Sequence, residues 1–305
     1  MRSLIQILIE AASLGSLYAL SALAIGLVFG IMRMINFAQG DLITLGAYAL
    51  IVPSSAMVAQ PLLAGLPWPL MLAGVAAVAV LAAMATERIA FRPMRGADPS
   101  TLLITSFAVS FLVQNLVLIV YGGRPKSAGI LPALSSNLAL GGGLSISLVQ
   151  VVTAAAAAVL MVGLSIFLKR TAIGIEMRAV AEDERMARLL GVRSNRLILA
   201  TFALSGLLAG AVAVLLVTQT GVLDFRMGVL LAVYAFFATV LGGMGSLPGA
   251  AVGGYLLGIL SVLLQAYLPG TLRPFRDAML FGIVVVLLLV RPQGLLAGRA
   301  ARERV

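Results

Sequence analysis

Cysteine and histidine are both absent from this chain of 305 residues. The absence of cysteine excludes disulfides and thiolate metal ligands, and the absence of histidine excludes imidazole ligands and histidine general bases. Rhomboid-like and metal-dependent membrane proteases of the kinds that use histidine are therefore disfavoured. The sequence also shows no nucleophile beside a candidate base. We expect no catalytic residue, no cofactor and no bound metal, and we do not expect an enzyme.

Charged residues are also scarce. They make up 10% of the chain, hydrophobic residues make up 61%, and the mean hydropathy is +1.11. A spanning helix needs about 20 residues, so there is room for about eight to ten spans and no large soluble domain. We predict an all-α polytopic membrane protein with about eight to nine transmembrane helices, some of them broken or re-entrant at Gly-rich segments. A single transmembrane domain is expected over residues 1–305.

Long apolar runs mark the predicted spans. The first run is too long for the apolar region of a signal peptide, so we interpret it as a transmembrane helix. Loops rich in Pro, Gly and small residues, Pro53–Trp68 and Gly122–Ser147, are expected outside. The spans are predicted at about Leu4–Ile31, Met32–Val52, Pro69–Thr86, Thr101–Tyr121, Leu148–Leu168, Leu197–Val217, two within residues 229–268, and Asp277–Val290.

The net charge of +10 comes from basic residues in short loops between apolar runs, so it indicates membrane topology and no nucleic-acid partner. The segments expected in the cytoplasm hold 15 of the 21 basic residues, which leaves six outside. This bias predicts an outer N-terminus and a cytoplasmic C-terminus. The cytoplasmic set comprises Arg33, three residues in Glu87–Ser100, seven in Lys169–Arg196 and four in the C-terminal run with Arg291, Arg299, Arg302 and Arg304. Arg273 and Arg276, which are assigned outside, weaken the assignment.

Two segments contain residues that are unusual in a membrane-spanning helix. The segment Met32–Val52 contains polar residues that would each be costly in lipid, about 2.5–3.5 kcal/mol for a central charge. It is either a short cytoplasmic turn or a functional broken helix with a break near Gly40. The Gly-rich stretch Gly242–Gly249 suits a tight, protein-buried reversal or the lining of a cavity. We hypothesise a polar passage whose residues are Asn36, Gln39, Asp41 and Thr44, with Gly243, Gly245 and Ser246 of the Gly-rich turn opposite.

The interval Lys169–Arg196 holds seven basic and four acidic residues between two apolar runs, so it is expected to be a cytoplasmic loop. Its spacing predicts one helix over Ile175–Leu190, capped by a left-handed glycine at Gly191. The predicted apolar face holds Ile175, Ala179, Met186, Leu189 and Leu190, and the predicted charged face holds Arg178, Glu184, Arg185 and Arg188. Ion pairs are expected between Arg178 and Glu182 and between Glu184 and Arg188.

Two interpretations of this helix remain open. It either folds back on its own membrane domain or docks onto a soluble partner. Glu182 projects into the apolar stripe, which a purely solvated helix would not need. The residues assigned to docking are Ile175, Arg178, Glu182, Asp183, Arg185, Met186, Leu190 and Gly191.

The run RAVAEDERMARLLGV within this interval resembles the coupling loop of ABC importer permeases of the branched-chain amino-acid (LivH) type. Ala181-Glu182-Asp183 stand at the family's Glu-Ala-Ala…Gly signature, and Gly191 follows eight residues after Asp183. Four further stretches, INFAQGD, ERIAFRPMRG, LGGMGSLPG and RPQG, resemble family motifs in the same order. Gln39 stands where histidine is usual, so a role for a titratable ring is not expected here.

The resemblance implies a permease subunit that translocates branched-chain or related amino acids across the bacterial inner membrane. It also implies separate ATPase subunits that receive the coupling loop, a second homologous permease as a hetero- or homodimer, and an extracytoplasmic substrate-binding protein. No GxxxxGK[ST] motif is present, so ATP hydrolysis is not expected in this chain. The alternative is an ion-coupled secondary transporter or channel for a small polar solute, for which the carboxylate candidates are Asp41, Glu10 and Asp277.

Overall fold

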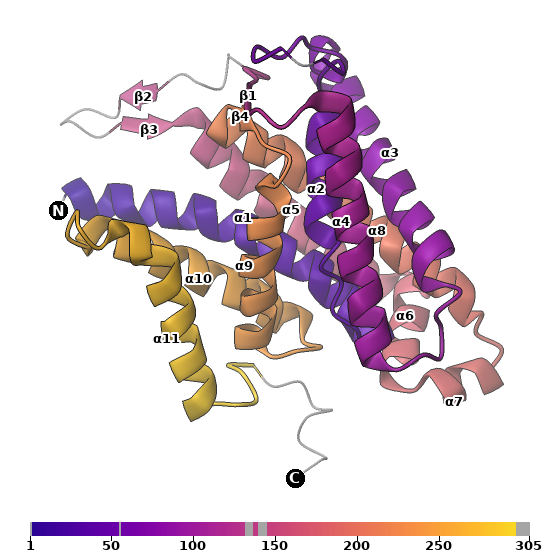
Figure 1. Ribbon diagram of the computed structural model, residues 1–305. Helices are drawn as coiled ribbons and strands as arrows, with labels where there is room; N and C mark the ends of the chain where they lie inside the picture. Colours follow the sequence, from indigo (N-terminus) through magenta and orange to yellow (C-terminus); the bar gives the residue numbers. More distant parts are fainter. Residues whose placement is uncertain (1, 55, 132–136, 140–144, 297–305) are drawn as a thin grey trace. The chain divides into compact units, whose positions relative to one another are not determined.

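The computed structural model describes residues 2–54, 56–131, 137–139 and 145–296, and the predicted C-terminal basic residues Arg299, Arg302 and Arg304 lie outside that part. Most of the described chain is helical (Figure 1). The helices are α1 (Arg2–Met32), α2 (Gln39–Tyr48), α3 (Trp68–Thr86), α4 (Pro99–Tyr121), α5 (Leu148–Arg170), α6 (Ala172–Glu182), α7 (Glu184–Leu189), α8 (Ser194–Thr220), α9 (Met227–Gly242), α10 (Leu247–Tyr267) and α11 (Arg276–Val290).

Short non-α elements complete the described chain. Strand β1 (Lys126–Ser127) pairs antiparallel with β4 (Val222–Leu223), and β2 (Asn137–Ala139) pairs antiparallel with β3 (Ser145–Ser147). Two 3₁₀ turns cover Leu63–Gly65 and Arg273–Phe275, and α3 runs directly into a π-helical turn over Glu87–Phe91.

Within the described residues, six helices have the length and hydropathy to cross a membrane, namely α1, α3, α4, α5, α8 and α10. The helix α9 is apolar but shorter, at 16 residues. Together these helices confirm the predicted all-α polytopic membrane class.

The predicted segment Met32–Val52 is not one continuous helix. The helix α1 ends at Met32, Arg33 adopts a φ of +52°, and helical structure resumes only at Gln39. With ten residues, α2 is about 15 Å long, half of the hydrocarbon thickness. The segment is therefore a broken helix, and its break precedes Gly40.

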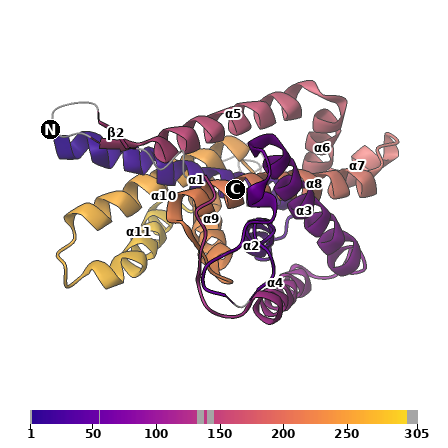
Figure 2. The ribbon, with the colours of Figure 1, turned by 90° about the horizontal axis from the view of Figure 1, so that it is seen from above.

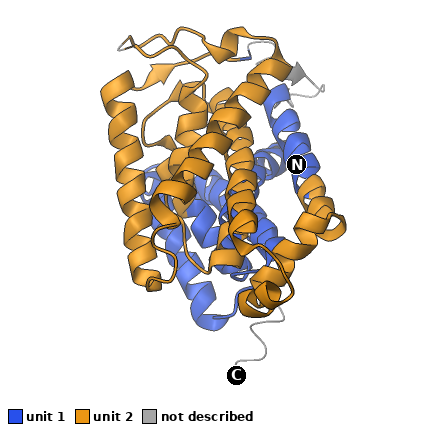
Figure 3. Ribbon diagram, turned by 90° about the vertical axis from the view of Figure 1, so that its right-hand side faces the viewer, with its two compact units in different colours: residues 1–26, 131–161, 234–305 blue, residues 27–130, 162–233 orange. Residues whose placement is uncertain are grey.

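The chain forms two compact units that alternate along the sequence (Figure 3). Unit 1 comprises residues 1–26, 131–161 and 234–305, and unit 2 comprises residues 27–130 and 162–233. Since neither unit is one continuous segment, a sequence boundary does not separate them. The prediction of a single domain over residues 1–305 stays a prediction.

Small residues hold the helices of unit 1 together. A Cβ atom on Gly258 of α10 would lie 2.2 Å from the Cα atom of Gly15 in α1, and one on Gly254 would lie 2.3 Å from the Cα atom of Ala19. These contacts are four residues apart on both helices, so the two backbones touch along a small-residue stripe. In lipid such close packing replaces the hydrophobic effect as the source of helix association.

In unit 2, α8 lies against α2 and α3, and α4 lies beside α2 (Figures 1 and 2). In the most apolar 18-residue stretch of each helix, 67% is buried in α8 but only 22% in α3 and in α4. The helix α8 is therefore the centre of this unit, and α3 and α4 expose apolar faces. A Cβ atom on Gly206 of α8 would lie 2.7 Å from the carbonyl oxygen of Ala79, so α3 and α8 also meet through small residues.

The predicted outer loop Pro53–Trp68 is hydrogen-bonded to β1. Lys126 is buried, and its Nζ atom donates to the carbonyl oxygens of Ser54 at 2.6 Å and Ala56 at 2.7 Å. The backbone of Ala59 donates to Ser127 at 3.0 Å. The ammonium group thereby satisfies carbonyls that a loop would otherwise leave to water.

Candidate functional site

The start of α2 gathers the polar residues that the sequence assigned to a passage. Asn36 Oδ1 accepts a hydrogen bond from the backbone of Ala38 at 3.1 Å, which closes a turn just before the helix. Each of the four predicted side chains, Asn36, Gln39, Asp41 and Thr44, is at most 1% exposed. The site therefore lies inside the protein.

Gln39 is fully engaged with α8. Its Nε2 atom donates to the carbonyl oxygen of Ser205 at 3.2 Å, and the Ser205 hydroxyl donates to Gln39 Oε1 at 2.7 Å. Two bonds to one residue fix the amide plane, so Gln39 orients α2 on α8.

Thr44 and Gly40 attach α2 to the start of α9. The backbone N–H of Gly228 donates to Thr44 Oγ1 at 3.2 Å. A Cβ atom on Gly228 would lie 1.8 Å from the carbonyl oxygen of Gly40, and one on Gly40 would lie 2.1 Å from that of Gly228. Glycine is required at both positions because the two backbones are in contact.

Asp41 has no such partner. Both of its carboxylate oxygens are buried without a hydrogen bond, and so is the Nδ2 atom of Asn36. The polar side chains that face Asp41 are Ser110 and Gln114 of α4, but neither makes a hydrogen bond of good geometry with it. Among the predicted passage residues, Asn36 and Asp41 therefore retain polar atoms that can receive a solute.

The Gly-rich turn between α9 and α10 belongs to unit 1, whereas the residues of α2 belong to unit 2. Gly243 and Gly245 have φ values of +105° and +87°, and Ser246 Oγ accepts from the backbone of Gly249 at 3.2 Å to cap α10. Gly243 is buried, and Gly245 at the tip is exposed. This geometry is a tight reversal, and its predicted place opposite α2 stays a prediction.

The interval Lys169–Arg196 does not form the single predicted helix. It forms α6 and α7, because Asp183 is extended, with a φ of −147°, and its side chain accepts from the backbone of Met186 at 3.0 Å. An aspartate is a favoured N-cap residue, and here it starts a new helix within the expected one. The predicted continuous apolar stripe is accordingly split between two helices (Figure 2).

One face of this pair packs on its own chain and another set of apolar residues is exposed. The buried residues are Gly174, Met177, Val180 and Ala187. Met186, Leu189 and Leu190 are 56%, 82% and 78% exposed. Arg178, Glu182, Asp183 and Arg185 are also exposed, and Ile175 is half exposed. Both sequence interpretations therefore describe a part of the element: it folds back along one side and presents apolar side chains on the other.

Of the two ion pairs predicted in the interval, the structure contains one. Arg188 and Glu184 form an ion pair at 2.6 Å. Arg178 and Glu182 are both among the described residues, and no ion pair joins them.

Gly191 occupies the left-handed position that the sequence predicted. Its φ is +85°, its backbone N–H donates to Arg188, and the N–H of Val192 donates to Ala187 at 3.1 Å. These two bonds are those of a Schellman motif, which ends α7 and turns the chain into α8.

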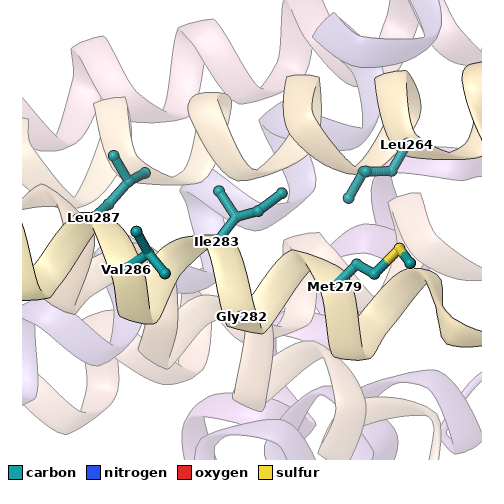
Figure 4. Close-up of a pocket in the computed structure, with 6 residues that line it drawn as sticks. All are labelled: Leu264, Met279, Gly282, Ile283, Val286 and Leu287. Carbon is teal, nitrogen blue, oxygen red and sulfur yellow. The ribbon is translucent and has the colours of Figure 1, made fainter.

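A surface groove of about 450 Å³ lies between α10 and α11 in unit 1 (Figure 4). Its lining is apolar: Leu264, Met279, Gly282, Ile283, Val286 and Leu287. A site for a polar solute needs a few convergent polar groups, so this groove is not the candidate for solute binding.

Sequence reasoning missed the partners of the α2 residues. Ser205 and Gly228 bind α2 from α8 and α9, and Ser110 faces Asp41 from α4. The available signal was weak: a serine followed by small residues four apart, Gly206 and Gly210, marks a close-packing helix but does not identify its neighbour.

Comparison with known proteins identifies the family. The family model described as "Branched-chain amino acid transport system / permease component" matches residues 7–290. The high-affinity branched-chain amino acid transport system permease protein BraD of Pseudomonas aeruginosa is 36% identical over 99% of this chain and 98% of its own length. The corresponding LivH protein of Escherichia coli K12 is 35% identical over 99% and 97%, and a probable LivH of Methanocaldococcus jannaschii is 26% identical over 92% and 88%.

No solved structure matches the chain. The family model and the two bacterial relatives nevertheless cover nearly all of its length. This chain belongs to the family of permease components of branched-chain amino acid transport systems.

Proposed function

We propose that this permease carries branched-chain or related amino acids into the cell, driven by ATP that separate ABC subunits hydrolyse. The observation that carries the proposal is the exposed apolar set Met186, Leu189 and Leu190, which lies within the charged interval Lys169–Arg196. Large exposed apolar side chains rimmed by charge mark a protein contact. The names of the relatives BraD and LivH support the substrate class.

In this proposal α6 and α7 form the coupling element, defined as residues 172–191. Its buried face, with Met177, Val180 and Ala187, fixes it to the membrane domain. Its exposed apolar residues enter the ATPase subunit, and Glu182 and Arg185 lie at the rim of the contact. Motion of the ATPase is thereby passed to a rigidly attached element.

The polar start of α2 is proposed as part of the translocation path, together with Gly243, Gly245 and Ser246 of the Gly-rich turn. Asn36 and Asp41 keep unpaired polar atoms inside the protein, where such atoms are costly and therefore indicate a functional site. Gln39 and Thr44 hold α2 in place beside them.

The remaining partners are those that the family resemblance implies, and the proposed topology rests on the distribution of basic residues. We propose a second homologous permease, two ATPase subunits, an extracytoplasmic substrate-binding protein, and a location in the bacterial inner membrane. The coupling element and the C-terminus lie in the cytoplasm and the N-terminus lies outside, as the distribution of basic residues favours.

The test is uptake into proteoliposomes that contain the permease, its homologous partner and the ATPases, with the binding protein added outside. We expect uptake of leucine, isoleucine or valine that requires ATP inside the vesicles. Mass spectrometry of ligand bound to the purified binding protein identifies the substrate. Uptake by the permease alone, driven by an ion gradient without ATP, would contradict the proposal and favour a secondary transporter.

A further inference from the structure

The segment after α3 contains a buried carboxylate that neither the coupling element nor the passage includes. Glu87 is 1% exposed and begins the π-helical turn Glu87–Phe91, in which the N–H of Arg92 donates to the Glu87 carbonyl oxygen at 2.7 Å. Single π turns in α-helices are rare and occur often at functional sites. The buried ring of Phe91 packs on Phe202 of α8, with a centroid distance of 5.6 Å.

Arg95 connects this turn to α8. One terminal nitrogen of its guanidinium donates to Glu87 Oε1, and the other donates to Asn195 Oδ1. The side chains of Arg95 and Glu87 are 19% and 2% exposed, so the ion pair is largely removed from water. A single planar group therefore ties the end of α3 to the first turn of α8.

The first turn of α8 is bonded in turn to α7. Ser194 Oγ accepts from Arg188 Nε at 3.3 Å, and Arg188 also pairs with Glu184 at 2.6 Å. Ser194 is buried, and Asn195 follows it directly. A chain of side-chain contacts thus leads from the coupling element, through the start of α8, to the end of α3.

We infer that Arg95 and Asn195 are positioning residues that transmit displacement of the coupling element to α3. This inference rests on the proposed function. Stability alone does not explain the contact, because a buried ion pair often stabilises no more than apolar side chains of the same volume. A fixed hydrogen-bond geometry does suit a rigid connection. The receiving helix α3 packs on α8 at Gly206. Movement of α3 therefore displaces α8, which is hydrogen-bonded to Gln39 of α2 through Ser205.

The principal test replaces Asn195 with alanine in the complete complex. Asn195 is exposed, so Asn195→Ala leaves the Glu87–Arg95 pair in place and strands no buried charge. ATP hydrolysis and amino-acid uptake are measured in the same proteoliposomes. We expect amino acid imported per ATP to fall about 2- to 30-fold, the range for a substitution along a coupling network. Asn195→Asp keeps the acceptor oxygen, so this variant is expected to import as much amino acid per ATP as the wild-type complex.

A second variant tests the other end of the contact. Arg95→Ala is compared with Arg92→Ala, which removes the same charge from the same loop at an exposed position. We expect a lower ratio of import to hydrolysis for Arg95→Ala and an unchanged ratio for Arg92→Ala, with normal retention of the ATPases in both.

Each outcome decides the inference. If Asn195→Ala and Arg95→Ala both keep the wild-type ratio, the transmitting role is wrong. A loss of permease abundance with an unchanged ratio identifies a purely structural contact and also overturns it. If the wild-type complex itself shows no ATP-dependent uptake, the proposed function fails first, and the inference falls with it.

Discussion

Gln39 and Asp41 lie two positions apart on α2, yet their surroundings differ. Gln39 exchanges two hydrogen bonds with Ser205, whereas both carboxylate oxygens of Asp41 are buried without a partner. A polar residue inside a membrane protein serves either packing or function, and the bonding of each side chain separates the two cases. On this basis Gln39 and Thr44 position α2, and Asn36 and Asp41 are the stronger candidates for contact with solute.

The first prediction tests water access to these residues. The chain has no cysteine, so each single substitution introduces its only thiol. Asn36→Cys and Asp41→Cys are expected to react with a charged, membrane-impermeant thiol reagent during turnover, because a translocation path must admit water and solute. Ile119→Cys is the control, since Ile119 is 79% exposed on an apolar helix and is expected to face lipid. Equal, slow labelling at all three positions would exclude the path.

The second prediction concerns the contact of Gly40 with Gly228. Gly228→Ala would place a Cβ atom 1.8 Å from the Gly40 carbonyl oxygen, so the backbones must separate. We expect the free energy of unfolding in detergent to fall by about 1–3 kcal/mol, as for other overpacked interiors. Gly163→Ala on α5 is the matched control, since a Cβ atom there meets nothing within 4 Å. Equal stability of the two variants would contradict the close approach.

Among the elements, the coupling element shows how far the sequence predicts structure. The exposure of the charged residues and the glycine cap at Gly191 were predictable because both depend on local chemistry. The break at Asp183 was not, because an aspartate inside a helical pattern is also compatible with an exposed helical position. Which apolar residues would be buried depended on contacts of α6 with α8, which a periodic pattern does not identify.

The same limit applies to α2 and to the turn after α3. Polar residues within Met32–Val52 indicated a break, but its position depended on the left-handed Arg33 and on the turn that the Asn36 side chain closes with Ala38. The basic residues of Glu87–Ser100 predict a cytoplasmic loop, and this stays a prediction. Burial of Glu87 beside Arg95 depends on how the folded chain packs, and the local sequence pattern does not show this contact.

The third prediction tests the coupling element. The double variant Met186→Asp, Leu190→Asp places charges on two exposed apolar side chains. If each side chain is buried against the ATPase, its loss costs about 1.5–3 kcal/mol. Together the two losses weaken association by roughly two to four powers of ten. Co-purification of ATPase and uptake are expected to fall together, while permease abundance in the membrane stays normal.

The control for this prediction uses the opposite face of the same element. Met177→Asp alters a residue buried against the chain itself, so it is expected to lower permease abundance first. Glu182→Lys, at the end of α6, is expected to weaken docking by repulsion from a basic partner residue. Normal ATPase retention and uptake in the double aspartate variant would remove the coupling role.

At the scale of the whole molecule, the fourth prediction concerns orientation in the membrane. Val58, on the loop bound to Lys126, is 73% exposed and is expected outside, and Arg92 is exposed and expected in the cytoplasm. In intact cells an impermeant thiol reagent is expected to label Val58→Cys directly and Arg92→Cys only after the membrane is permeabilised. The reverse pattern would invert the topology and place the coupling element outside, away from any ATPase.

The last prediction concerns assembly. The described part of the chain carries one proposed coupling element, and an importer driven by two ATPase subunits is expected to need one such element for each of them. Two permease chains are therefore expected in the working complex, either a homodimer or a pair of homologues. Exposed apolar and small-residue helix faces are available for a helix contact in lipid. Native mass spectrometry of the purified complex is expected to give two permease and two ATPase chains. A single permease chain that imports amino acid without ATP would show that one copy suffices, and with it that the coupling element has no role in transport.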